Sequence, residues 1–383
     1  MKVGLSLVIS LIAIDLVLHA KENAQTKPEI VLEMIYELDS AKLHHGNVLI
    51  SEVRDRLRKK SEDIPRKDID WVLNKLRLDI IRQTKTLYTD TGKEIEIPYF
   101  AKYPAKVPHS SNYEYFILNT CDYEHGTPTK QVTKLIKTHD GNVLWEISNQ
   151  MMLCAFISND GNVTIDATDA VAPRVERNLK NVRFYDKTGN LVKTAGDLLS
   201  FSMWTAMADI GNLFVAMSGK DGSYLICFDG QGDELWRTPV PGIEVKISFF
   251  NSNKFLIYTS LDGHTLLIDD TGEIIGDYDF TIREGTFTDD NEYFIFDKIA
   301  DSVYYLKTQN GDIFCDKITG TPGKNVQYYF VDMFDKLDAE GVVMLDKSGA
   351  ICAVYIEQGV VSPNKHIIVT PKGIYLLEMK NAE

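Results

Sequence analysis

The sequence lacks the signatures that would assign it a chemistry. Its 383 residues include five cysteines, an odd number, and no Cys-x-x-Cys pair occurs, so neither a disulfide framework nor a zinc site is predicted. Phosphate-binding loops and the His-Glu-x-x-His, Gly-x-Ser-x-Gly and EF-hand motifs are absent from it. The sequence therefore predicts no catalytic residue, no metal ligand and no cofactor, and a protein that is not an enzyme is expected.

The composition excludes wholesale disorder. Apolar residues make up 44% and charged residues 25% of the chain, which are ordinary values for globular proteins. A chain of 383 residues is too long for one ordinary core, so several domains or a repeat are expected. The formal net charge is −14. A uniformly acidic protein would avoid nucleic acid and anionic membranes, so the distribution of the basic residues matters more than the sum.

A long apolar run stands at the N-terminus, from Val3 to Leu18 behind Lys2. It fits the apolar core of a signal peptide or a short membrane anchor, although Asp15 inside it costs about 2.5–3.5 kcal/mol on insertion. We expect residues 1–24 to form a hydrophobic helix that associates the protein with a membrane, on a side that the flanking charges leave open. The alternative is a cytoplasmic protein in which this helix is buried.

Residues 25–100 predict a small α+β domain. Apolar residues at i, i+3, i+4 and i+7 predict one helix after Pro28 and another near residue 70. The buried positions would be Val31, Met34, Ile35 and Leu38 in the first and Ile69, Val72, Leu73 and Leu76 in the other. Between them, residues 45–51 predict an extended piece, with Ser51 as the N-cap of a middle helix. The stretch TLYTDTGKEIEI predicts a hairpin around Gly92.

This order of elements resembles the layout of winged helix-turn-helix domains, which implies binding to DNA or docking to a protein. Charge supports the resemblance, because twelve Lys and Arg stand against seven Asp and Glu between Ala41 and Lys85. In a DNA-binding member, the basic and amide side chains of the last two helices would contact phosphates and a groove. The candidate nucleic-acid or partner contacts are Arg54, Arg58, Lys59, Lys60, Arg66, Lys67, Asn74 and Lys75.

The plainer interpretation of these charges is a solvated helix surface. Asp55, Asp68 and Asp70 alternate with the basic residues and would serve as ordinary i, i+4 partners. The acidic remainder of the chain would also repel DNA unless it were held away. Docking to DNA and docking to a protein therefore both stay open.

From about residue 101 onward one turn recurs along the chain. Its glycines are spaced 48, 43, 40, 39 and 48 residues apart, and all but the last follow an Asp or Thr by three positions. They are Gly141, Gly189, Gly232, Gly272, Gly311 and Gly359. The Asp or Thr side chain caps the turn amides, and glycine accepts positive φ. A period near 40–45 residues predicts a mainly β fold, a β-propeller over residues 101–383 with seven blades or alternatively six.

Two of the turns carry a Gly-x-x-x-Trp element that ends at Trp145 and Trp236. It resembles the repeat of PQQ-like, quinoprotein-type propellers, close neighbours of WD40 propellers; the resemblance implies the fold but no quinone cofactor. Both tryptophans are expected to dock one blade on the next. The final hairpin, HIIVTPKGIYLLEM, has no outer strand after it, so a strand from residues 95–120 is expected to complete the last blade.

A polar insertion in the second unit is a candidate recognition loop. Its charged residues are Asp166, Asp169, Arg174 and Arg177. A solvated loop is the simpler interpretation.

The function expected is a non-catalytic scaffold. Its propeller would bind a protein or small ligand, and its basic N-terminal unit would dock to DNA or a protein. The alternative is an exported or membrane-anchored scaffold without a role at DNA. An enzyme carried by the propeller comes third, because a fold alone licenses no reaction.

Overall fold

The structure is a computed structural model. It describes residues 29–380 apart from 61–63, 98–106, 125–126, 149–153, 168–178, 200–201, 208–211, 220–221, 242–243, 250–254, 261–262, 281, 288–292, 299–301, 310–311, 318–328, 333–340, 346–349 and 357–358. The hydrophobic helix expected over residues 1–24 lies outside the described residues.

The described chain is mainly β and forms a succession of small antiparallel sheets. Four of these sheets contain four consecutive strands each. Two of them consist of β7 (Cys154–Ile157), β8 (Val163–Ala167), β9 (Leu179–Tyr185) and β10 (Leu191–Leu199), and of β11 (Ser202–Met207), β12 (Leu213–Gly219), β13 (Gly222–Phe228) and β14 (Glu234–Pro239). The next two consist of β15 (Glu244–Phe249), β16 (Phe255–Ser260), β17 (Thr265–Asp269) and β18 (Ile274–Tyr278), and of β19 (Ile282–Phe287), β20 (Tyr293–Lys298), β21 (Ser302–Gln309) and β22 (Asp312–Lys317).

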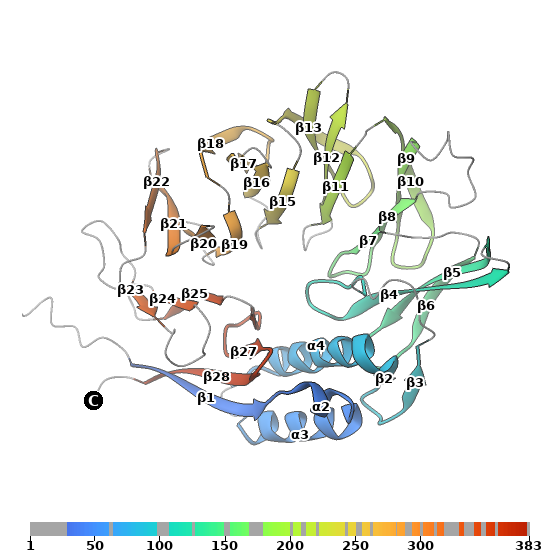
Figure 1. The fold of residues 1–383 in the computed structure, drawn as a ribbon, viewed down its shortest axis with the longest axis vertical. Coiled ribbons are helices and arrows are strands. Elements are labelled where there is room, and N and C mark those ends of the chain that lie inside the picture. Colours follow the sequence, from blue (N-terminus) through green and yellow to red (C-terminus); the bar gives the residue numbers. More distant parts are fainter. Residues whose placement is uncertain are drawn as a thin grey trace, which may run out of the picture.

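Two further sheets are described with three strands each. They are the first sheet, β4 (Tyr115–Glu124), β5 (Thr127–Lys137) and β6 (Val143–Ser148), and a later one, β23 (Tyr329–Asp332), β24 (Gly341–Leu345) and β25 (Ile351–Ile356). The last sheet contains β26 (Val360–Val361), β27 (Ile367–Thr370) and β28 (Gly373–Lys380). In Figure 1 the sheets follow one another in chain order around an arc that returns to its start. The protein therefore has a propeller-like fold.

Packing between sheets explains why the inner strands are so apolar. Four consecutive side chains are buried in β13, and four again in β17. A strand with a neighbouring sheet against each of its faces has no solvent side, so the alternation of polar and apolar residues disappears. Cys227 lies in β13 and is buried, and its burial raises the pKa of the thiol to about 12. The predicted strands of these repeats are confirmed.

The recurring turns have the geometry that their residues predict. Gly189, Gly232 and Gly272 have φ of 86°, 84° and 87°. In each of these turns the Asp three positions earlier accepts hydrogen bonds from the backbone N–H groups two and four residues after it. The first turn differs, because there Asp140 rather than Thr138 accepts from Asn142 N. Gly311 lies outside the described residues.

The same turns dock each sheet on the one before it. Each glycine packs so tightly on an aromatic side chain of the preceding sheet that a Cβ would come within 2.6–2.7 Å of the ring: Gly189 on Trp145, Gly232 on Phe184 and Gly272 on Trp236. The prediction that the two tryptophans dock sheet on sheet is confirmed. Glycine is thus required twice, for its positive φ and for the close approach of the ring.

The last sheet is completed by a strand from the other end of the chain. β1 (Glu29–Glu37) pairs antiparallel with β28, from Glu29 opposite Lys380 to Glu37 opposite Gly373. The sheet order is β1-β28-β27-β26. An outer strand is present as expected, but the prediction that residues 95–120 supply it is wrong. Those residues include β4, which begins its own sheet.

The helical unit differs from the winged-helix order. The helix expected from Pro28 is instead strand β1, and α3 (Gly46–Lys59) begins where an extended piece and the N-cap Ser51 were expected. A short helix, α2 (Ser40–Leu43), precedes α3. The long helix α4 (Arg66–Thr84) and the hairpin of β2 (Thr86–Tyr88) and β3 (Glu94–Glu96) are as predicted.

This helical unit lies at the junction of the last sheet and the first (Figure 1). The core of α3 and the first half of α4 includes Ile367, Val369, Ile374 and Leu376 of the last sheet. The second half of α4 and the hairpin share another core with Phe116 and Ile136 of the first sheet. A Cβ on Gly141 would collide with Ile95 of the hairpin. In the later sheets, the glycine of the turn contacts the preceding sheet. In the first sheet, the hairpin takes the place of that preceding sheet.

We expect Gly272→Ala to destabilise the protein by about 3 kcal/mol, from positive φ and overpacking together. Gly92→Ala is the matched control, because Gly92 has φ of 78° but nothing within 4 Å of an added Cβ, and it should cost only about 1 kcal/mol. Denaturant unfolding followed by circular dichroism measures both. Equal losses would contradict the docking of Gly272 on Trp236.

Candidate functional site: a groove between α3 and α4

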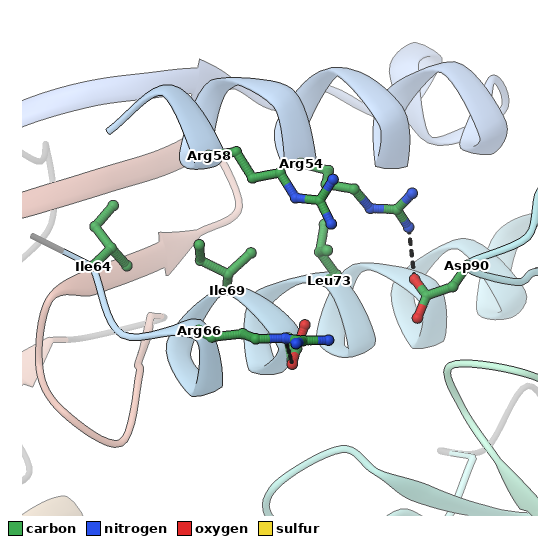
Figure 2. Close-up of a pocket in the computed structure, with 8 residues that line it drawn as sticks. Arg54, Arg58, Ile64, Arg66, Ile69, Leu73 and Asp90 are labelled. Carbon is green, nitrogen blue, oxygen red and sulfur yellow. Dashed lines mark hydrogen bonds and ion pairs between the residues drawn. The ribbon is translucent and has the colours of Figure 1, made fainter. Parts of the chain in front are cut away.

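A groove of about 740 Å³ opens between α3 and α4. Its floor is aliphatic, formed by Ile64, Ile69 and Leu73, which are all buried. Figure 2 shows Arg54 and Arg58 reaching down from α3 toward α4. The described residues that line it are Arg54, Arg58, Ile64, Arg66, Ile69, Asp70, Leu73 and Asp90. The arrangement combines an apolar floor with a cationic rim.

The three arginines of the groove are not equally available to a ligand. Arg54 donates to Asp90 Oδ1 at 2.6 Å, so its guanidinium is already engaged in an ion pair. The side chain of Arg66 is 92% exposed, and its Nε lies 3.6 Å from Asp70 Oδ2. An exposed ion pair at this distance is weak. Arg58 is exposed and has no ion-pair partner among the described residues. Arg58 and Arg66 are therefore the cations that the groove offers.

A buried arginine holds the wall of the groove in place. Arg77 donates from Nε to Tyr88 O at 2.8 Å, from Nη1 to Asn74 Oδ1 at 2.8 Å and from Nη2 to Asp90 Oδ1 at 2.5 Å. Burial lowers the pKa of Arg77, but a guanidinium stays charged in proteins. With Arg54, it fixes Asp90 of the hairpin turn against α4. The hairpin end of the groove is therefore rigid, and its carboxylate, Asp90, is bound by two arginines.

A second pocket, of about 360 Å³, adjoins the groove. The two share Arg66, Asp70 and Asp90. The remaining lining residues are Asn74 and Arg77 of α4 and, from the first sheet and its turns, Glu114, Tyr115, Lys137 and His139. Asp90 N donates to His139 O at 2.8 Å, and this bond holds the hairpin turn on the first sheet. The second pocket thus joins the helical unit to that sheet.

The structure brings together only some of the predicted contact residues. Arg54, Arg58 and Arg66 line the groove. Lys59 and Lys67 are exposed outside it, and Lys60 Nζ donates to Glu33 of β1 at 2.7 Å. Asn74 is buried under Arg77 and reaches only the second pocket, and Lys75 pairs with Asp79 at 2.5 Å.

The predicted recognition loop is largely outside the described residues. Asp169, Arg174 and Arg177 all lie there, and Asp166 is in β8. Across the described residues, no group of three His, Cys, Asp or Glu is placed to hold a metal ion. No described helix is both long enough and apolar enough to cross a bilayer.

The position of Asp68 differs most from the one that the sequence predicts. It was expected on the surface, but it is fully buried at the start of α4. Its carboxylate faces Ser362 Oγ at 2.9 Å, Asn364 N and Nδ2 at 3.2 and 3.0 Å, and His366 Nδ1 at 3.3 Å. These partners form the turn between β26 and β27, nearly 300 residues away. No local pattern marks such a residue.

Comparison with known proteins finds similar folds among solved structures only. No family model matches the chain, and no curated protein matches it. Similar solved structures include BamB from Moraxella catarrhalis, with a TM-score of 0.38, 16% identity, and 72% of this chain and 83% of that chain covered. Another is a complex of KlAtg21 with the coiled-coil of AgAtg16, with a TM-score of 0.42, 12% identity and 72% and 84% coverage.

A third similar structure is the dihydro-heme d1 dehydrogenase NirN, with a TM-score of 0.41, 15% identity and 68% and 60% coverage. All three likenesses are distant. The propeller-like class follows from the order and docking of the sheets in this chain rather than from these neighbours.

We expect Asp68→Asn to lower the free energy of unfolding by about 3 kcal/mol. The substitution replaces a buried charged acceptor by an amide, and the NH₂ of that amide would face groups that are themselves hydrogen-bond donors. Asp70→Asn is the control, since this exposed carboxylate of the same helix is only weakly paired and should cost no more than about 0.5 kcal/mol. Urea unfolding followed by circular dichroism compares the two. Similar small losses in both variants would contradict the role assigned to Asp68.

Proposed function

We propose that the protein is a non-catalytic scaffold. Its sheets form a seven-bladed propeller, and the helical unit at the junction of the last and first blades docks a protein partner in the α3–α4 groove. The observation that carries this proposal is an aliphatic floor flanked by Arg58 and Arg66 from two different helices. Apolar area gives a partner affinity, and exposed arginines at its edge give orientation.

The chemistry of the groove favours binding over catalysis. The described residues of its lining are arginines, aliphatic side chains and two carboxylates, Asp70 and Asp90, each of which lies next to an arginine. Nucleophilic catalysis typically pairs a nucleophile with an adjacent base, and these described residues offer no such pair.

The groove also favours a protein over DNA. Asp70 and Asp90 lie in its lining, where they would face the phosphates of a duplex. Lys60 and Lys75, which the DNA interpretation needs, already hold partners at 2.7 and 2.5 Å. Phosphate contacts require several free cations on one surface.

The test changes charge at neighbouring positions on the same helices. We expect the pair Arg58→Glu and Arg66→Glu to abolish co-purification of the partners that the full chain retains in extracts of its own cells, as measured by quantitative mass spectrometry. The pair Lys59→Glu and Lys67→Glu makes the same charge change outside the groove and should leave the partners bound.

Binding to duplex DNA would contradict the proposal of protein docking. If the full chain binds duplex DNA with an affinity that falls steeply between 50 and 200 mM salt, and both pairs weaken that binding alike, the protein-docking proposal fails and the DNA interpretation replaces it.

We further propose that residues 3–18 associate the protein with a membrane. Their apolar sequence supports this, and they precede β1, the outermost strand of the last sheet. The full chain should sediment with membranes after a high-salt wash, whereas a chain that begins at residue 25 should stay in the supernatant. Identical fractionation of both chains would contradict it.

A further inference from the structure

The two pockets adjoin along α4 and share Arg66, Asp70 and Asp90, so we treat them together as a combined groove. Residues Arg66, Asp70, Asn74 and Arg77 line them at spacings of four, four and three, which is a single face of a helix. Eleven residues of helix rise about 17 Å. The combined groove therefore runs for three turns, from the α3–α4 side to the first sheet.

Cationic side chains lie on both sides of this combined groove. Arg58 stands beside the aliphatic floor, Arg66 lines both pockets, and Lys137 of β5 lines the second pocket together with the exposed Glu114. Lys137, like Arg58, has no ion-pair partner among the described residues. The described lining has five cationic and three acidic side chains. Arg77 is buried and shares Asp90 with Arg54, so Arg58, Arg66 and Lys137 are the cations left for a ligand, in a chain with a net charge of −14.

The middle of the combined groove is polar and holds hydrogen-bond acceptors. Asp70 lies there with little compensation, and Asp90 is bound by two arginines on one of its oxygens. Carboxylate oxygens accept the N–H groups of an extended backbone. They repel phosphates and carboxylates alike, so this part of the lining opposes a nucleic acid, and a peptide bound there would have to place its acidic side chains elsewhere.

The width of the groove sets the conformation of its occupant. Val53 and Leu57 of α3 and Val72 and Leu76 of α4 are buried in one core beneath it, so the two helices are already packed together. A third helix of about 10–12 Å diameter would have to part them. An extended chain advances about 3.3 Å per residue, so roughly five residues cover about 17 Å.

We propose, building on the protein-docking function, that the partner presents an extended acidic segment. One aliphatic side chain lies on Ile69 and Leu73, a carboxylate next to it pairs with Arg58 and Arg66, and a second carboxylate near the other end pairs with Lys137. The segment crosses from the helical unit to the first sheet. Arginine and lysine at the two ends give the segment its direction, because arginine binds a carboxylate with two hydrogen bonds.

The probe is a phage-displayed library of random nonapeptides, panned against the full chain. We expect the enriched peptides to carry two or more Asp or Glu about four residues apart with an aliphatic residue between them. An enriched peptide, labelled with fluorescein, should bind at least tenfold more weakly to Arg58→Glu and also to Lys137→Glu. Lys59→Glu is the matched control and should bind it within twofold of the unchanged chain.

The outcomes separate this inference from the function on which it rests. If Arg58→Glu weakens binding and Lys137→Glu does not, docking in the α3–α4 groove stands and the extended crossing is overturned. If neither variant weakens binding, both proposals fall. Enriched peptides without acidic residues overturn the inference, as does no enrichment at all. Melting temperatures of the variants and partial rescue by Arg58→Lys exclude a loss of fold as the cause.

Discussion

The buried carboxylate of Asp68 is the constraint on which the junction of this protein depends. An unpaired charge in that position would cost several kcal/mol, and four donor atoms from one turn of the last sheet remove the cost. The same turn is thereby held at the start of α4. Because Arg77 holds the hairpin near the other end of this helix, α4 connects the last sheet to the first.

Because of this connection, the first and last sheets meet through the helical unit. In a simple ring of sheets, the first and last sheets pack directly against each other. Here β1 covers the edge of β28 and the hairpin covers the Gly141 turn, so a structured unit lies between them. The groove opens between α3 and α4, whose buried faces share one core with the last sheet.

The repeated part was predictable because its signals are local. An Asp or Thr with Gly three residues later fixes a turn, and apolar strands on both sides fix a hairpin, so most strands from β12 to β22 follow from short stretches. The residues of β1 show the limit. Val31, Met34 and Ile35 fit a helical spacing, but the free edge of β28 decides for a strand. Likewise, net charge indicated Arg58 and Arg66, whereas the burial of Asp68 and Asn74 depends on partners that local sequence does not reveal.

The pairing of β1 with β28 also orders events during synthesis. Residues 29–37 leave the ribosome early but have no partner until residues 373–380 follow, roughly 15–70 s later at ordinary rates of elongation. Until then α4 lacks a settled partner for Asp68, and the core of α3 and α4 lacks Ile374 and Leu376. A chain that stops before residue 373 therefore lacks both the strand that pairs with β1 and part of the core on which the helical unit packs.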